Sequence, residues 1–169
     1  MNFEKIYTEF KSRILRFTFN YTRNYNEQEE LVQEIFFNIF RSLNNFKNKS
    51  QISTYIYSIA RNTCLNYIKG NIRERKKIEK IKKFTELQYE ANPYEHVELS
   101  DNSKFLLEML DKIPDENREI FFLAEIEKLK YREISEIKKI PIGTVKSRLN
   151  RAKEKIVELL KSTKGGFYE

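Results

Sequence analysis

The sequence predicts an all-α fold made of two small helical domains, joined by a flexible acidic linker, with a helix-turn-helix in the second domain. The 169 residues include only four glycines and three prolines, which leaves few positions for tight turns. Apolar side chains recur every three or four residues along most of the chain, and the alternation typical of strands is not sustained anywhere. Residues 85–101 hold acidic side chains and no lysine or arginine, so we expect domains at 1–84 and 102–163 around this linker.

Two amphipathic helices are expected at the start of the first domain, at 3–21 and at about 26–43. The first has an apolar stripe made of Ile6, Phe10, Ile14, Phe17 and Tyr21. The second has a stripe made of Leu31, Ile35, Ile39 and Leu43. Its first turn is acidic, as the helix dipole favours. Phe36, Phe37 and Phe40 add more apolar surface than one small core uses, so we expect some of these rings to contact a partner.

A third helix is expected to begin at Ile52, after the polar loop 44–51, which carries Lys47 and an exposed Phe46. Its buried face is expected to contain Ile52, Ile56, Ile59, Ala60, Cys64 and Ile68. Its other face presents Tyr55, Arg61, Asn62, Asn66 and Lys69. Between 61 and 83 nine cations accompany two carboxylates, a balance of 9 − 2 = +7, which equals the formal net charge of the whole chain.

In the second domain, two short helices separated by Pro114 are expected to support a pair of helices joined by a tight turn at 131–155. Pro141 lies in the turn and disfavours the helical region for the residue before it. We expect Gly143 to supply the conformational freedom that the reversal needs, and Thr144 to cap the second helix.

The second helix of this pair has one apolar face and one largely cationic face. The apolar face contains Val145, Leu149, Ala152, Ile156, Leu159 and Leu160. The other contains Lys146, Ser147, Arg148, Asn150, Arg151, Lys153 and Lys155. Such a helix fits the major groove of DNA, where Arg, Asn and Ser can pair with base edges and Lys can bind phosphates. A merely solvated face is the alternative, but the near absence of acidic residues at 137–153 and the preceding turn favour DNA binding.

Composition argues against several other classes of protein. The net charge indicates a polyanionic partner, and a single cysteine, Cys64, supports neither a disulfide framework nor a zinc site, so we expect a cytoplasmic protein. No apolar run approaches the length of a membrane span, so no membrane insertion is expected. With His96 as the sole histidine and no phosphate loop or HExxH pattern, we expect no catalytic residue, no metal and no cofactor. A metal-dependent nuclease stays open as an alternative, although no acidic pair has a persuasive spacing.

Four blocks make residues 3–160 resemble a bacterial RNA polymerase sigma factor of the small extracytoplasmic-function (ECF) group of the sigma-70 family. They are EELVQEIFFNIFRSL at 29–43, TYIYSIARNTCLNYIK at 54–69, LDKIPDENREIFFL at 110–123 and YREISEIKKIPIGTVKSRLNRAKEKI at 131–156. The resemblance implies a subunit that binds core RNA polymerase and directs transcription initiation without catalysis of its own. It would read the −10 element with the first domain and the −35 element with the helix-turn-helix.

The resemblance assigns residues of this chain to three surfaces. The polymerase contact would contain Glu30, Gln33, Glu34 and Phe37. The −10 element would meet Phe46, Lys47, Tyr55, Arg61, Asn62, Asn66, Lys69 and Arg73, among which Asn62 and Asn66 would read exposed bases. The −35 element would meet Thr144, Lys146, Ser147, Arg148, Asn150 and Arg151. Tyr55 stands where the family often has tryptophan, so the resemblance does not predict how efficiently this protein opens the DNA strands.

The partners implied are core RNA polymerase, promoter DNA and an anti-sigma factor, and we expect the free protein to be a monomer. A stand-alone helix-turn-helix repressor or activator, with the N-terminal helices forming a dimer, is the alternative function. It would bind a palindromic duplex tightly without polymerase, whereas a sigma factor would bind duplex DNA poorly alone.

Overall fold

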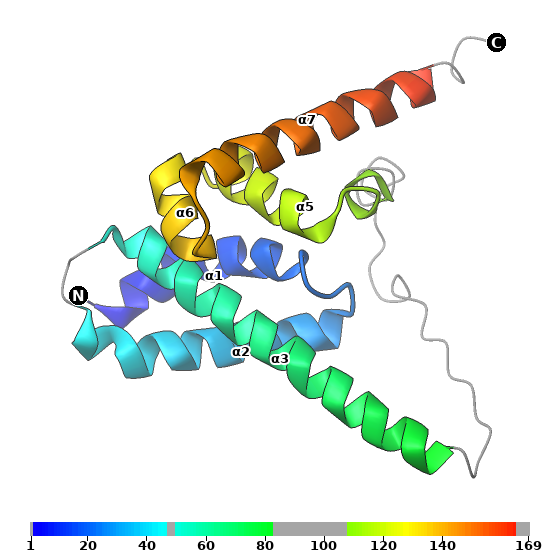
Figure 1. The fold of residues 1–169 in the computed structure, drawn as a ribbon. Helices are drawn as coiled ribbons and strands as arrows, with labels where there is room; N and C mark the ends of the chain where they lie inside the picture. The colour runs from blue at the N-terminus through cyan, green and yellow to red at the C-terminus, as the bar shows by residue number, and fades with distance from the viewer. Residues whose placement is uncertain (1, 47–49, 83–107, 165–169) are drawn as a thin grey trace. The chain divides into compact units, whose positions relative to one another are not determined.

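The structure is a computed structural model that describes residues 2–46, 50–82 and 108–164, in which every regular element is a helix (Figure 1). The chain divides into two units, Met1–Val97 and Glu98–Glu169. We call them unit 1 and unit 2. The all-helical prediction is confirmed. The predicted linker at 85–101 lies outside the described residues.

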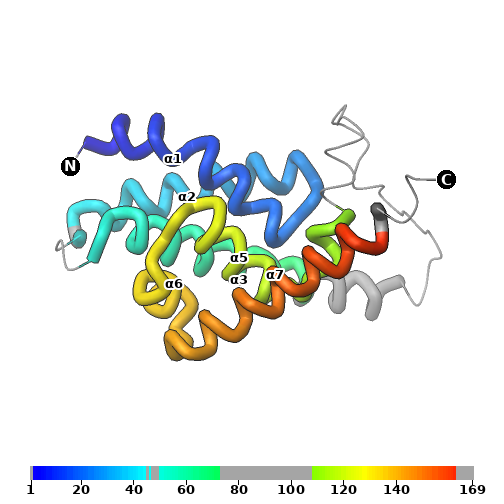
Figure 2. Tube along the Cα trace, turned by 90° about the horizontal axis from the view of Figure 1, so that it is seen from above, coloured from blue at the N-terminus to red at the C-terminus, as the bar shows by residue number. Residues whose placement is uncertain are grey.

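Unit 1 contains α1 (Phe3–Thr18), α2 (Tyr25–Ser42), the short 3-10 helix η1 (Leu43–Asn45) and α3 (Ile52–Lys82). α2 contacts both α1 and α3, and Figure 2 shows α1 and α2 side by side. Asparagine side chains cap the first two helices. Asn2 accepts a hydrogen bond from the Glu4 N–H at 2.9 Å, and Asn24 accepts from the two N–H groups that follow Tyr25. These caps explain why the helices begin where they do.

The core of unit 1 contains most residues of the predicted apolar stripes, together with Val32, Phe36 and Tyr57, which the stripes did not include. The predicted stripe residues that are only half-buried are Tyr21, Leu43, Ile52, Ile59 and Ile68. Ile6, Phe10, Ile14, Phe17, Leu31, Ile35, Ile39, Ile56, Ala60 and Cys64 are buried. Tyr57 was not predicted and is fully buried, with its ring centroid 6.4 Å from Phe10 and 5.3 Å from Phe17. Because α3 contacts α1 as well as α2, its buried face is wider than the single stripe that spacing predicts.

Unit 2 contains α5 (Asp115–Phe121), the π-helical turn η2 (Phe122–Ile126), α6 (Tyr131–Lys138) and α7 (Ile142–Lys164). α7 contacts both α5 and α6, and its predicted residues Val145, Leu149 and Ala152 are buried. The apolar stripe does not stay buried along the whole helix. Leu160 is 41% exposed, contrary to prediction, because α7 continues beyond the helices that support it.

The tight turn between α6 and α7 differs from the prediction at two positions. Lys139, with φ 54°, adopts the left-handed conformation that ends α6, and Gly143 has no positive φ. α7 begins at Ile142, so Gly143 and Thr144 both lie within its first turn and Thr144 is not the cap. Pro141 stands immediately before the helix, where its missing N–H costs nothing.

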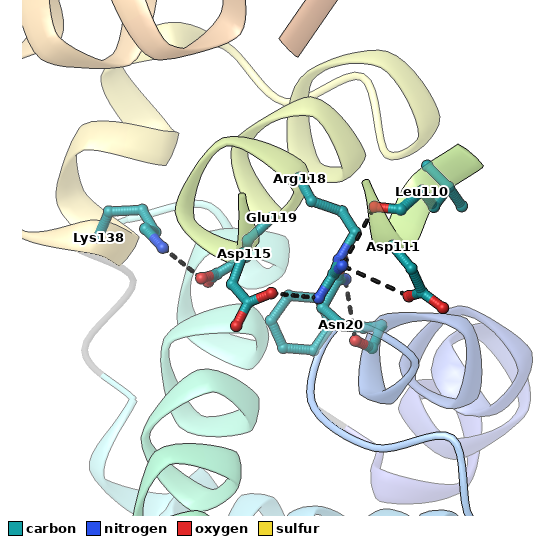
Figure 3. A network of polar contacts seen from close by, with 8 residues as sticks. Asn20, Leu110, Asp111, Asp115, Arg118, Glu119 and Lys138 are labelled. Carbon is teal, nitrogen blue, oxygen red and sulfur yellow. Dashed lines mark hydrogen bonds and ion pairs between the residues drawn. The ribbon is translucent and has the colours of Figure 1, made fainter. Parts of the chain in front are cut away.

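Buried charges join the elements of unit 2, which the sequence did not predict (Figure 3). Lys138 of α6 donates to Glu119 of α5, and both side chains are less than a tenth exposed. Arg118 donates to the Leu110 carbonyl at 3.1 Å and to Asp115 Oδ1 at 2.7 Å. Buried charges need such partners, so α5 fixes both the preceding turn and α6.

Candidate nucleic-acid interface

The outward face of α3 carries the predicted amide residues. Asn62, Asn66 and Lys69 are exposed at spacings of four and three residues, so they share one side of the helix. Arg73 continues this spacing on the same helix, but its side chain lies outside the described part. Arg61 is half-buried and has a partner within the protein, so it is not part of the exposed surface formed by Asn62, Asn66 and Lys69.

A hollow of about 440 Å³ opens between α2 and α3 beside these amides. It is lined by Asn38, Arg41, Ser42, Ile59, Asn62, Thr63 and Asn66. Asn38 Nδ2 donates to Thr63 Oγ1 at 3.2 Å, which ties the two helices together at this place. The amides, hydroxyls and guanidinium offer both donors and acceptors, the combination that can read the edge of an unpaired base. The sequence reasoning missed Asn38 and Arg41, because only the packing of α2 on α3 brings them to Asn62.

Phe46 and Tyr55 form an aromatic pair at the start of α3. Their ring centroids are 4.8 Å apart with an interplanar angle of 43°, and both side chains are half-buried. Phe46 was predicted to be exposed, but its contact with Tyr55 covers part of the ring. The Tyr55 hydroxyl donates to the Ser42 carbonyl at 2.9 Å, which fixes the tyrosine ring against the end of α2. Partly exposed rings of this kind are suitable platforms for base stacking. Lys47, predicted beside them, lies outside the described residues.

The outward face of α2 is acidic and aromatic instead of basic. Glu30, Gln33, Glu34 and Phe37 are all exposed and follow the spacing of one helix face. Phe37 is 58% exposed, as the sequence predicted from its surplus of rings, and Phe40 is 60% exposed.

The carboxylates of α2 affect the pKa of a tyrosine on α3. Partial burial raises the pKa of Tyr67 on α3; a hydrogen bond with Asn71 opposes this rise, while the negative charges of Glu27, Glu30 and Glu34 add to it. The carboxylates of α2 therefore contribute to the environment of this one side chain on α3.

The outward face of α7 separates into two groups of residues. Lys146, Ser147, Asn150 and Arg151 are exposed, and within the described residues neither Lys146 nor Arg151 has an ion-pair partner. Arg148 is different, because its guanidinium lies 2.5 Å from Glu116 of α5 and its side chain is only 24% exposed. Thr144 is half-buried.

A second ion pair holds α7 to the turn η2. Lys153 Nζ lies 2.6 Å from Glu125 Oε1. The hydrogen bond from Lys153 lowers the pKa of Glu125, and the same bond raises the pKa of Lys153. Sequence patterns do not predict either pair, because the acidic partners come from other elements than α7.

Comparisons with known proteins match both units. Residues 6–74 match the family described as Sigma-70 region 2, and residues 106–156 match Sigma-70, region 4. The ECF RNA polymerase sigma-E factor of Escherichia coli K12 is 32% identical over 135 residues, covering 75% of this chain and 70% of the relative. That of Haemophilus influenzae is 30% identical over 138 residues, covering 78% and 73%. This chain belongs to the ECF group of the sigma-70 family.

The function of this sigma factor is promoter recognition in transcription initiation. Its fold is shared with the sigma factor RpoE, solved in complex with the anti-sigma factor NepR from Bartonella quintana (TM-score 0.71, 22% identity, 94% of this chain and 96% of that chain). CnrH, solved with the cytosolic domain of CnrY, is similar as well (TM-score 0.69, 14% identity, 95% and 88%).

The described residues of the sigma factor lack two further features. None of their helices is long and apolar enough to cross a membrane, and they contain no group of three or more His, Cys, Asp or Glu side chains placed to hold a metal ion.

Proposed function

We propose that this sigma factor docks on core RNA polymerase through the outward face of α2 and reads a promoter with one surface in each unit. The observation that carries the proposal is the contrast between helix faces. α3 and α7 expose amides and cations, whereas α2 exposes carboxylates beside phenylalanine rings. The first chemistry suits nucleic acid, and the second suits a basic and partly apolar protein surface.

The docking surface would consist of Glu30, Gln33, Glu34 and Phe37, with Phe40 as an additional apolar contact. Aromatic rings are enriched at the centre of protein interfaces, and polar and charged side chains surround them at the rim. The sigma factor RpoE, which shares this fold, was solved in complex with the anti-sigma factor NepR, and this supports an anti-sigma factor as a second partner of this chain. The free protein would then be a monomer in the cytoplasm, with its docking surface open.

In unit 1, the −10 element would be read as unpaired bases. Asn62 and Asn66 line the hollow between α2 and α3, and the rings of Phe46 and Tyr55 offer a stacking surface. Unstacking a base costs a few kcal/mol, and stacking on protein rings together with amide hydrogen bonds offsets that cost. Lys69 and Arg73 would bind the phosphates.

In unit 2, the −35 element would be read as duplex DNA by the exposed residues of α7. Lys146, Ser147, Asn150 and Arg151 are the base and phosphate contacts in this proposal. Arg148 would act mainly as a positioning residue, since Glu116 holds its guanidinium. Two weak reading surfaces become effective together when polymerase holds both of them near one promoter.

The proposal is tested by run-off transcription with core polymerase, plus and minus this protein, on the promoter upstream of its own gene. We expect a start site that depends on the protein, and its loss when Glu30 and Glu34 are both replaced by glutamine. Glu4→Gln/Glu9→Gln in α1 is the matched control, because both of these carboxylates are exposed outside the docking surface. Absence of any protein-dependent start, there and on a genomic library, would contradict the proposal.

The alternative function is that of a stand-alone repressor or activator. Measuring the binding of the protein to duplex DNA without polymerase distinguishes it from the proposed function. Tight binding to a palindromic site by the protein alone would favour that alternative. The proposed subunit has no catalytic role of its own, so incubation with plasmid and magnesium is expected to leave the DNA uncut.

A further inference from the structure

Two of the four glycines lie in the described residues, Gly70 in α3 and Gly143 in α7, and the fold requires neither of them. Neither has a positive φ, so an L-amino acid with a side chain could adopt either backbone conformation. A Cβ atom built at either position would meet no atom within 4 Å. Both residues are exposed. Turn geometry and internal packing therefore both fail to explain them.

Glycine nevertheless weakens a helix, because the unfolded chain gains more freedom from it than from any other residue. Gly70 stands well inside α3, far from a helix end where glycine is usual. A helical glycine that the fold does not require is a position where the backbone of the helix is open to close approach by another molecule.

The positions of the two glycines indicate what that partner is. Gly70 follows Asn66 by four residues and directly follows Lys69, so it extends the exposed amide face of α3. Gly143 precedes Lys146, Ser147 and Asn150 by three, four and seven residues, which places it on the same side of α7. Each glycine is therefore part of a surface assigned above to promoter DNA.

We propose that Gly70 and Gly143 are close-approach sites, where the backbone of α3 or α7 lies directly against the sugar-phosphate backbone of the promoter. This inference rests on the proposed function. A methyl group at either site would move the two backbones apart by roughly the length of one carbon–carbon bond, about 1.5 Å. A shift of that size takes neighbouring amide or ammonium groups out of the range of about 2.7 to 3.2 Å in which N–H donors bond.

The test replaces each glycine by alanine in the full-length protein and measures stability and promoter occupancy separately. Better helix propensity should raise the unfolding temperature of either variant by about 2 to 6 °C. Promoter complexes formed with core polymerase should fall by about tenfold, the equivalent of one or two lost hydrogen bonds. Gly70→Gln should lower occupancy further than Gly70→Ala, since its side chain is longer.

Matched controls use exposed serines on helices of the same units. Ser12→Ala in α1 and Ser162→Ala near the end of α7 also improve helix propensity, but neither position belongs to a proposed DNA surface. We expect both controls to leave promoter occupancy unchanged. Association with core polymerase in the absence of DNA should be equal for all five variants and the wild type.

The outcomes are distinguishable. Alanine variants that gain stability and keep full promoter occupancy would overturn the inference, and so would variants that lose stability, because the glycines would then be structural. Permanganate reactivity of the −10 region should fall for Gly70→Ala, and protection of the −35 region should fall for Gly143→Ala. If the wild type itself fails to direct transcription, the proposed function fails, whatever the glycine variants do.

Discussion

The two helices proposed to read DNA, α3 and α7, are held in place by different means. α3 rests on a core of apolar side chains and rings, in which Tyr57 packs against Phe10 and Phe17. α7 also buries apolar residues, but ion pairs add to its support, with Arg148 bound to Glu116 and Lys153 bound to Glu125.

The difference has a physical consequence. Apolar packing carries no charge for ions to screen and does not titrate, whereas exposed and half-exposed ion pairs weaken as ions screen them. The position of the α3 amides should therefore be constant across conditions. Some cations of α7, Arg148 and Lys153, hold the helix through ion pairs, and others are proposed to contact DNA, so the arrangement of this helix should depend more on ionic strength.

The largest expected effect comes from breaking the buried pair between Lys138 and Glu119 in unit 2. Lys138→Met leaves the Glu119 charge buried without its partner, which should cost about 3 to 5 kcal/mol of stability. Urea unfolding of the full chain, followed by the amide signals of Ile134 and Leu149, measures this cost, and the amide of Ile35 reports on unit 1 at the same time.

The double variant Lys138→Met/Glu119→Leu is the control for this prediction. It removes both charges and should recover most of the lost stability, since an apolar pair of similar volume can replace a buried ion pair. Lys161→Met, at an exposed position of α7, should have almost no effect. A Lys138→Met variant as stable as Lys161→Met would mean that the pair does not hold unit 2 together.

A smaller effect is expected on promoter affinity and base specificity, and it should differ between the alanine variants of Arg151 and Arg148 on α7. If Arg151 pairs with a base, Arg151→Ala should cost about 1 to 3 kcal/mol and relax specificity at one position of the −35 element. Arg148→Ala should lower affinity for correct and altered elements alike, because Glu116 holds that guanidinium. Quantitative footprinting of holoenzyme on single-base promoter variants makes the comparison. Loss of discrimination at a single base in Arg148→Ala, with none in Arg151→Ala, would reverse the two assignments.

The sequence predicted most of unit 1 because its stripes are long and regular. Residues such as Phe10, Ile14 and Ile35 repeat at helical spacing, and that spacing alone places them in the core. The hollow beside Asn62 was not predictable in the same way. It depends on where Asn38 and Arg41 of another helix come to lie, which periodicity within one helix does not contain.

In unit 2, the sequence identified the two helices of the helix-turn-helix but misplaced the residue that makes the turn. Glycine is the usual left-handed residue, so Gly143 was the natural choice, yet the chain uses Lys139. The ion pairs of Lys138, Arg148 and Lys153 were also missed, because each joins residues of different elements.

The turn provides a modest test of this correction. Lys139→Gly should stabilise unit 2 by about 0.5 to 1 kcal/mol, since the left-handed conformation strains any residue with a Cβ. Thermal unfolding of the full chain measures it. Lys161→Gly is the control, because Lys161 is exposed in α7 and has no positive φ, so glycine there should lower stability instead of raising it. A loss of stability in Lys139→Gly would contradict the conclusion that the left-handed conformation of Lys139 strains the turn.

The smallest expected effect concerns the exposed pair of Glu125 and Lys153. The pKa of Glu125 is lowered by its hydrogen bond with Lys153, so its contribution to stability is present above the ordinary carboxyl pKa and is lost as pH falls through the lowered value. The pKa of Lys153 is raised, so its contribution is present below the ordinary lysine pKa and is lost as pH rises through the raised value. The pair therefore stabilises the protein across neutral pH.

In a carboxyl NMR titration, Lys153→Met should return the pKa of Glu125 toward its ordinary value, whereas Lys161→Met should not move it. An unchanged Glu125 pKa in Lys153→Met would show that this pair does not bind α7 to η2, and α7 would then differ less from α3 in its dependence on charge.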